Sequence, residues 1–168
     1  MTQTTLPRVV LLTVAALVAA TVTTYSASRR DVPLDERVRG AERIVGGHVM
    51  MVRSEFTTNE FGDRLIVTRA RVVVSEVLKG RVPTSTMEVD LEGGTVGRLR
   101  LQVSDMPEVG PGDHVVFMLR ENATGRQVPS MRGQGVFKLN RQGRDDEQGI
   151  TLEDIRAAAK GGRGPAQR

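Results

Sequence analysis

Histidine is the side chain best suited to neutral base chemistry near pH 7, and this 168-residue chain has two of them, His48 and His114, and no cysteine. They fall on separate predicted strands with no recognisable partner spacing, and Asp113 beside His114 would point to the opposite face of an extended strand. A metal site needs three or four convergent ligands, but the sequence contains no H-x-x-H motif and no acidic calcium loop. We therefore expect ordinary surface or barrel-rim histidines, with no catalytic residue, no cofactor and no metal.

Glycine-rich segments and charge patterning exclude two further kinds of chemistry. Residues 93–97 and 133–135 precede predicted strands rather than helix N-termini, so they are expected to be turns and not phosphate loops. The 24 basic and 20 acidic side chains are interleaved, and aromatic platforms beside basic residues are lacking, so no nucleic-acid partner is expected. The acidic run 145–147 is predicted to be a solvated loop.

Two phenylalanines, Phe56 and Phe61, stand on an otherwise polar segment, 55–63, that is predicted to be a loop. Exposed loops on rigid scaffolds commonly carry binding contacts, so this segment and a second predicted loop over 121–132 are the candidate surfaces for a protein partner. The alternative is that both phenylalanines cap the end of the fold.

Alternating apolar residues predict the strands that would position these loops. The longest strand runs from Leu65 to Leu78, and a change of apolar parity near Glu76 predicts a bulge that bends it. The run 115–119 is apolar on both parities, as expected of a strand covered on both sides. Residues 136–139 form the last predicted strand, and Thr151 is predicted to open a short C-terminal helix.

Charged residues predict one strand register in particular. Residues 87–91 and 99–103 both alternate apolar with charged side chains around a glycine-rich segment. Folding them as a hairpin about Thr95 would place Glu92 opposite Arg98 and Asp90 opposite Arg100 on the wet face.

Five or six strands with one long bent member and a terminal helix predict an all-β fold, a small closed or partly open five- to six-stranded barrel of the oligonucleotide/oligosaccharide-binding (OB) type. The alternative is a two-sheet β-sandwich. Residues 44–49 and 72–80 resemble the first half of netrin-like domains, the group that includes the tissue inhibitors of metalloproteinases.

Residues 43–140 are also similar to small exported bacterial domains of unsettled function, some of them beside or fused to matrixin-like metalloproteases. The shared elements are "evlKG", a G-G hairpin, "vGdxVvxFL" and "qGxF", at residues 76–80, 93–94, 110–119 and 134–137 here. This resemblance implies the barrel fold and not an activity. The tissue inhibitors place an N-terminal cysteine on the protease zinc, and this chain has no cysteine, so that mechanism is not carried over.

The N-terminal region indicates export. An apolar run from Val9 to Val22 follows Arg8, and small and polar residues continue through Ser28, which is typical of a signal peptide or signal anchor over 1–28. The run is shorter than the roughly 20 residues of a membrane-spanning helix, so a cleaved signal is favoured over an anchor formed by residues 9–25. A linker over 29–42, a barrel domain over 43–140, and a polar loop, short helix and flexible tail over 141–168 are expected to follow.

These features predict an extracytoplasmic protein, whether secreted, periplasmic or in the cell envelope, that contacts the membrane only if the leader is uncleaved. Its expected function is that of a non-catalytic binding or assembly module with a protein partner. The alternative, which rests on the resemblance, is an inhibitor or accessory partner of an exported metalloprotease that works without cysteine–zinc chelation.

Overall fold

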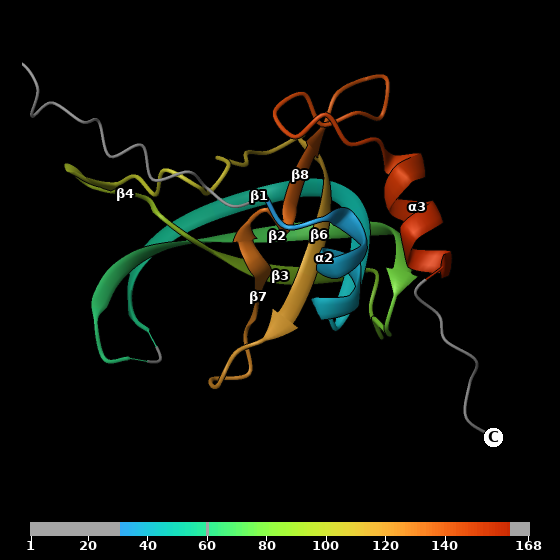
Figure 1. Cartoon of the computed structure of the whole chain (residues 1–168). Coiled ribbons are helices and arrows are strands. Elements are labelled where there is room, and N and C mark those ends of the chain that lie inside the picture. Colours follow the sequence, from blue (N-terminus) through green and yellow to red (C-terminus); the bar gives the residue numbers. More distant parts are fainter. Residues whose placement is uncertain (1–30, 60, 162–168) are drawn as a thin grey trace, which may run out of the picture. The chain divides into compact units, whose positions relative to one another are not determined.

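The computed structural model describes residues 31–59 and 61–161 of the chain, so the predicted leader over 1–28 lies outside the described residues. The described residues are mostly β, with a short C-terminal helix, as expected (Figure 1). The helices are α2 (Leu34–Gly40) and α3 (Leu152–Gly161); the strands are β1 (Arg43–Thr58), β2 (Arg64–Lys79), β3 (Thr86–Glu92), β4 (Gly94–Val96), β5 (Leu99–Leu101), β6 (His114–Glu121), β7 (Gln127–Gly133) and β8 (Val136–Leu139).

Six strands form one antiparallel sheet in the order β3-β2-β1-β6-β7, with β8 also paired to β6. The sheet is strongly curled (Figure 1). An ion pair links β3 and β7, because Arg132 of β7 lies 3.1 Å from Glu92 of β3. No backbone ladder joins β3 to β7 in the part of the chain that the structure describes, so the sheet does not close into a barrel. The second sheet, β4 with β5, has two short strands and does not form the alternative sandwich.

Bulges bend the long β1–β2 ladder where the sequence predicted one. The register shifts between Gly46 and Gly47, where Ser75 of β2 is the extra residue, and again between Ile44 and Val45. Gly47 permits the close approach at this bend, because a Cβ there would lie 2.2 Å from the carbonyl oxygen of Val73. The predicted bulge near Glu76 is confirmed.

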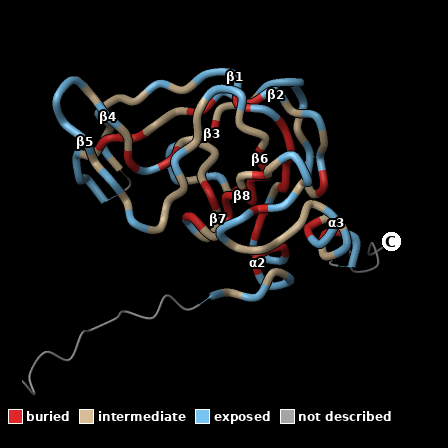
Figure 2. The backbone as a smooth tube through the Cα atoms, turned by 90° about the horizontal axis from the view of Figure 1, so that it is seen from above, coloured by how far each residue is buried: buried red, intermediate tan, exposed pale blue. Residues whose placement is uncertain are grey.

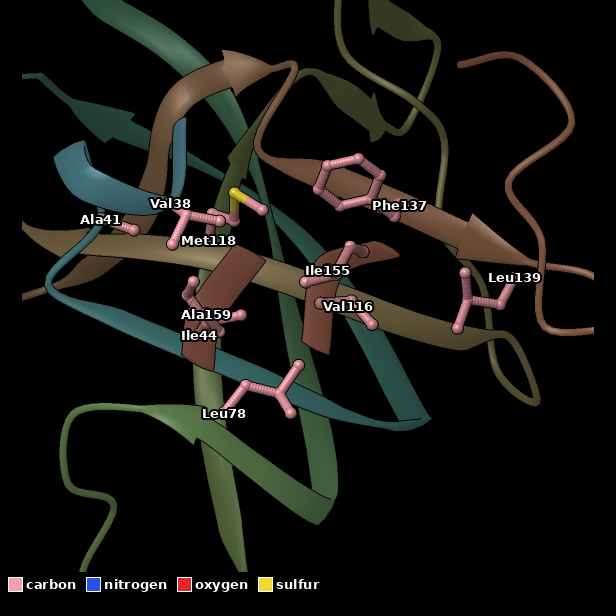
Figure 3. Close-up of a cluster of buried hydrophobic side chains, with 10 residues drawn as sticks. All are labelled: Val38, Ala41, Ile44, Leu78, Val116, Met118, Phe137, Leu139, Ile155 and Ala159. Atoms are coloured by element: carbon pink, nitrogen blue, oxygen red, sulfur yellow. The ribbon is translucent and has the colours of Figure 1, made fainter. Parts of the chain in front are cut away.

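The sheet has apolar side chains on both faces and therefore contributes to two cores. Val115, Phe117 and Leu119 of β6 point into one cluster, which we call the sheet core, while Val116 and Met118 point into the other. The second cluster, which we call the helix core, lies under α2 and α3 (Figure 3) and consists of Val38, Ala41, Ile44, Leu78, Val116, Met118, Phe137, Leu139, Ile155 and Ala159. The prediction that 115–119 is covered on both sides is confirmed.

Helix α2 occupies half of the segment 29–42 that was predicted to be a linker. Val38 is 1% exposed in the helix core, and Arg37 is 6% exposed. The Arg37 guanidinium donates hydrogen bonds to the carbonyl oxygens of Val32 (2.5 Å) and Gln134 (3.1 Å). The linker prediction over 29–42 did not foresee this packing, because seven helical residues with one buried face leave too short a pattern to detect.

The predicted hairpin register about Thr95 is wrong. Strand β3 pairs with β2, which places Asp90 opposite Arg69, and β4 pairs with β5 about a turn at Gly97. Gly93 and Gly94 both have positive φ, and they turn the chain away from β3 before β4 begins. Strand β2 pairs with β3 over seven residues, with Arg69 opposite Asp90 and Arg71 opposite Glu88, and this longer ladder outcompetes the local hairpin.

Candidate functional site

The first four residues of the segment predicted to be a loop over 55–63 belong to β1, and hydrogen bonds order the turn that follows them. The side-chain oxygen of Asn59 accepts hydrogen bonds from the backbone N–H groups of Phe61 (3.0 Å) and Asp63 (2.8 Å). The Gly62 N–H donates to the carbonyl oxygen of Asn59 at 3.1 Å. This turn holds the Phe61 ring in solvent, where the residue is 82% exposed.

Phe56 lies on β1, behind this turn, in a different environment. It is 39% exposed, and the guanidinium of Arg64 lies over its ring, 4.5 Å from the ring centroid. The arginine therefore covers part of Phe56 by a cation–π contact. The two predicted partner-binding residues thus differ in exposure. Phe56 is partly covered by Arg64 of the same hairpin, whereas Phe61 is mostly in solvent.

A third exposed apolar side chain, Leu99, lies on the β4–β5 hairpin and is 61% exposed. Both hairpins extend at the end of the described fold opposite α3 (Figures 1 and 2), where exposed and intermediate residues predominate. We call the turn after Thr58 together with β4 and β5 the hairpin end. Sequence reasoning missed Leu99 because it assigned the residue to a buried face of the wrong hairpin.

The second predicted partner loop, over 121–132, contributes contacts to the fold. It contains the end of β6, a turn and most of β7. The Asn122 side chain orders the turn by accepting a hydrogen bond from the Arg126 N–H at 2.9 Å. The Arg126 guanidinium lies 3.5 Å from Asp90 and 3.9 Å from Glu88, both on β3, so the loop helps to draw the sheet edges together.

The "evlKG" motif at residues 76–80 attaches both helices to the sheet. Glu76 pairs with Arg156 of α3 at 2.9 Å, and Leu78 is in the helix core. The Lys79 ammonium donates to three carbonyl oxygens at the C-terminal end of α2, those of Val38 (2.8 Å), Arg39 (3.1 Å) and Ala41 (2.6 Å). At Gly80, where φ is +78°, a Cβ would lie 2.7 Å from the carbonyl oxygen of Glu42. Each of these roles is structural.

The acidic run 145–147 is not simply a solvated loop, because Asp145 is 3% exposed. Its carboxylate accepts hydrogen bonds from the N–H groups of Lys138 and Gln148, each at 2.7 Å. The carboxylate is therefore engaged in shaping the turn after β8. Among residues 31–59 and 61–161, no group of three or more His, Asp or Glu side chains could hold a metal ion.

The two histidines, expected to be unrelated, are directly opposite each other on neighbouring strands. His48 of β1 pairs with His114 of β6, and their rings stack with centroids 4.6 Å apart and planes 21° apart. Burial lowers the pKa of the His114 imidazole below its usual 6.5, and the charges of His48 and Arg156 add to that effect while Glu76 opposes it. Sequence spacing could not reveal this pair, because it depends on which strand β6 joins.

Comparisons with known proteins gave no match from which a function could be transferred. No protein-family model matches the chain, and no curated protein is similar enough to indicate a relationship. Within the described ranges, neither helix has the length and apolar character needed to cross a membrane.

Proposed function

We propose that this chain is a non-catalytic binding module that acts outside the cytoplasm and engages a protein partner through its hairpin end. The observation that carries the proposal is Phe61, an aromatic side chain that is 82% exposed on a turn ordered by its own hydrogen bonds. Leu99 adds a second exposed apolar side chain at the same end. The apolar N-terminal run supports a location outside the cytoplasm.

An exposed aromatic on a rigid turn is well suited to serve as an anchor at an interface. Burying a phenylalanine side chain contributes roughly 1.5–3 kcal/mol, and a few such anchors dominate the binding energy of most interfaces. Because the Asn59 hydrogen bonds already order the turn, little conformational entropy would be lost when a partner covers Phe61.

The charges around these side chains favour a protein surface over a polyanion. Arg53 pairs with Glu55 at 3.0 Å, and Arg100 of β5 pairs with Glu108. Arg64 lies over Phe56. These three cations are engaged by neighbours within the molecule, whereas single-stranded nucleic acid is bound by a positively charged groove beside aromatic side chains.

We further propose that the curled sheet is a partly open barrel of the OB/netrin-like type. The order β3-β2-β1-β6-β7 supports this, since β3 and β7 are the two strands that closure would join. The ion pair between Glu92 and Arg132 lies across that gap.

Capture of partners from the envelope fraction of the native host tests the proposed function. The full chain, Phe61→Ser, Leu99→Ser and the control Val77→Ser would each be used as bait; Val77 is 40% exposed on β2, close to the helix core. We expect Phe61→Ser to weaken recovery of the partner at least tenfold, as at an interface hot spot, and Val77→Ser to leave it unchanged. Equal recovery by folded Phe61→Ser would contradict the proposal.

The runner-up function, inhibition of an exported zinc metalloprotease, rests on the resemblance at residues 76–80. Those residues attach the helices here, which supports the fold implied by the resemblance more than the inhibition. Slowed peptide cleavage by a matrixin-like protease in the presence of the full chain would favour the runner-up, and unchanged cleavage would remove it.

A further inference from the structure

The chain has two histidines and no cysteine, and the fold sets those two histidines directly opposite each other on β1 and β6. We propose that His48 and His114 together form a two-imidazole site for a divalent transition-metal ion such as Ni²⁺, Zn²⁺ or Cu²⁺. This proposal is independent of the partner-binding function, because the site lies on different strands from β4 and β5 and does not include the β1–β2 turn.

The backbone places both rings within reach of one ion. Directly opposed residues of an antiparallel ladder have Cβ atoms about 4.5–5.5 Å apart, and an imidazole nitrogen binds zinc at about 2.0–2.1 Å. In the ladder, His48 continues the row Ile44–Gly46, and His114 continues the row Met118–Val116 on the opposite strand. Both rings therefore project from the face of the sheet that carries the helix core.

Ring orientation is the one change that binding requires. In the stacked arrangement the nitrogen lone pairs of the two rings run side by side in nearly parallel planes, 21° apart, so they do not converge. His48 is exposed, whereas His114 is half-buried. We therefore expect the His48 ring to be the one that turns toward an ion bound by His114.

The charged neighbours of the pair neutralise each other. Glu76 of β2 and Arg156 of α3 influence His114 and form an ion pair at 2.9 Å, and Arg156 also pairs with Glu153. Glu76 is therefore engaged, and the ion would be held by two imidazoles and water. Two protein ligands are fewer than the three or four of structural and catalytic zinc sites, so the site would bind the ion exchangeably rather than retain it as a permanent part of the fold. Imidazole nitrogen selects Cu²⁺, Ni²⁺ and Zn²⁺ over Mg²⁺ and Ca²⁺, which prefer six or more oxygen ligands.

Calorimetric titration of the untagged full chain with NiCl₂ and ZnCl₂ at pH 7.5, with MgCl₂ as the negative control, tests the site. The matched variant is His48→Phe, which keeps an aromatic ring against His114 but removes the ligand. We expect saturable one-to-one binding of Ni²⁺ and Zn²⁺, at least tenfold weaker in His48→Phe and in His114→Phe, and no binding of Mg²⁺.

Two further readouts keep the test independent of any folding defect. Bound metal should raise the Tm of the wild type and not of His48→Phe, because the pair exists only in the folded chain. Substoichiometric Ni²⁺ should broaden both imidazole proton resonances together. Binding of equal strength in His48→Phe, broadening of one ring alone, or no saturable heat with folded wild type would each overturn the proposal.

Discussion

Strand β1 has different surroundings at its two ends. Near α2 and α3, Ile44–Gly47 and Val49 of β1 are buried, and both faces of the neighbouring β6 are covered. None of the residues 50–58 of β1 is buried. The two described helices thus cover one end of the sheet, whereas Phe61 and Leu99 are exposed at the other. We expect core substitutions to destabilise the protein most at the helix end, and the proposed partner contact lies at the hairpin end.

The strongest test of this comparison makes one substitution at both ends. Phe137→Ala empties a fully buried site in the helix core and should lower the free energy of unfolding by about 3–5 kcal/mol, from lost burial and the cavity left behind. Phe61→Ala removes a ring that is 82% exposed and should change it by no more than about 0.5 kcal/mol. Urea denaturation measures both, and similar losses at the two ends would break the distinction.

The packing of α2 against the sheet should depend on one side chain, the ammonium group of Lys79. Lys79→Met keeps the aliphatic stem but removes the donor to three carbonyl oxygens, and should cost about 1–2 kcal/mol. Hydrogen exchange should accelerate selectively in α2, since a seven-residue helix depends on its tertiary contacts. Lys138→Met, which removes a donor to the carbonyl oxygen of Glu108 and an ion pair with Asp113, is the control; acceleration of α2 exchange there would contradict this assignment.

The corrected strand register predicts which charges are coupled. Asp90 and Arg69 are 14% and 15% exposed and 2.8 Å apart, so a double-mutant cycle with Asp90→Asn and Arg69→Met should give a coupling of about 1 kcal/mol. The same cycle between Asp90 and Arg100, the pair expected from the sequence, should give about zero. The reverse pattern would restore the hairpin about Thr95.

These residues also show how far the sequence could predict the fold. The alternation of apolar and polar residues is a local pattern. It therefore predicted the strands at 65–78 and 115–119, the bulge near Glu76 and the C-terminal helix. The partner of β3 was not, because its acidic residues match Arg98 and Arg100 nearby as well as Arg69 and Arg71 across the sheet. The pairing of His48 with His114 is hidden for the same reason. Of the candidate site, Phe61 was identified from its polar surroundings, whereas Leu99 was lost with the wrong register.

The smallest expected effect is a pH dependence from the charged face of β2 and β3, where a hydrogen bond from Arg71 at 2.9 Å lowers the pKa of the Glu88 carboxyl below its usual 4.5. The charges of Arg69 and Arg126 add to this lowering, and partial burial opposes it. Below about pH 4.5 the unfolded chain therefore takes up a proton before the folded chain does. The contribution of Glu88 to stability is full above that pH and is lost as the pH falls through its folded pKa.

Because the Glu88 side chain is 38% exposed, solvent screens its contribution to stability. The part of the unfolding free energy that Glu88 contributes should therefore fall only slightly as the pH is lowered. Urea midpoints measured between pH 3 and pH 6 should show a weaker acid dependence in Glu88→Gln than in the wild type. Arg71→Met should also weaken the dependence of the urea midpoint on acid pH, since the hydrogen bond from Arg71 is the largest cause of the lowered pKa of Glu88. Adding Glu88→Gln to Arg71→Met should then weaken this dependence little further. If the second substitution weakens it as much as it does in the wild type, the Glu88 carboxylate is stabilised chiefly by its other neighbours.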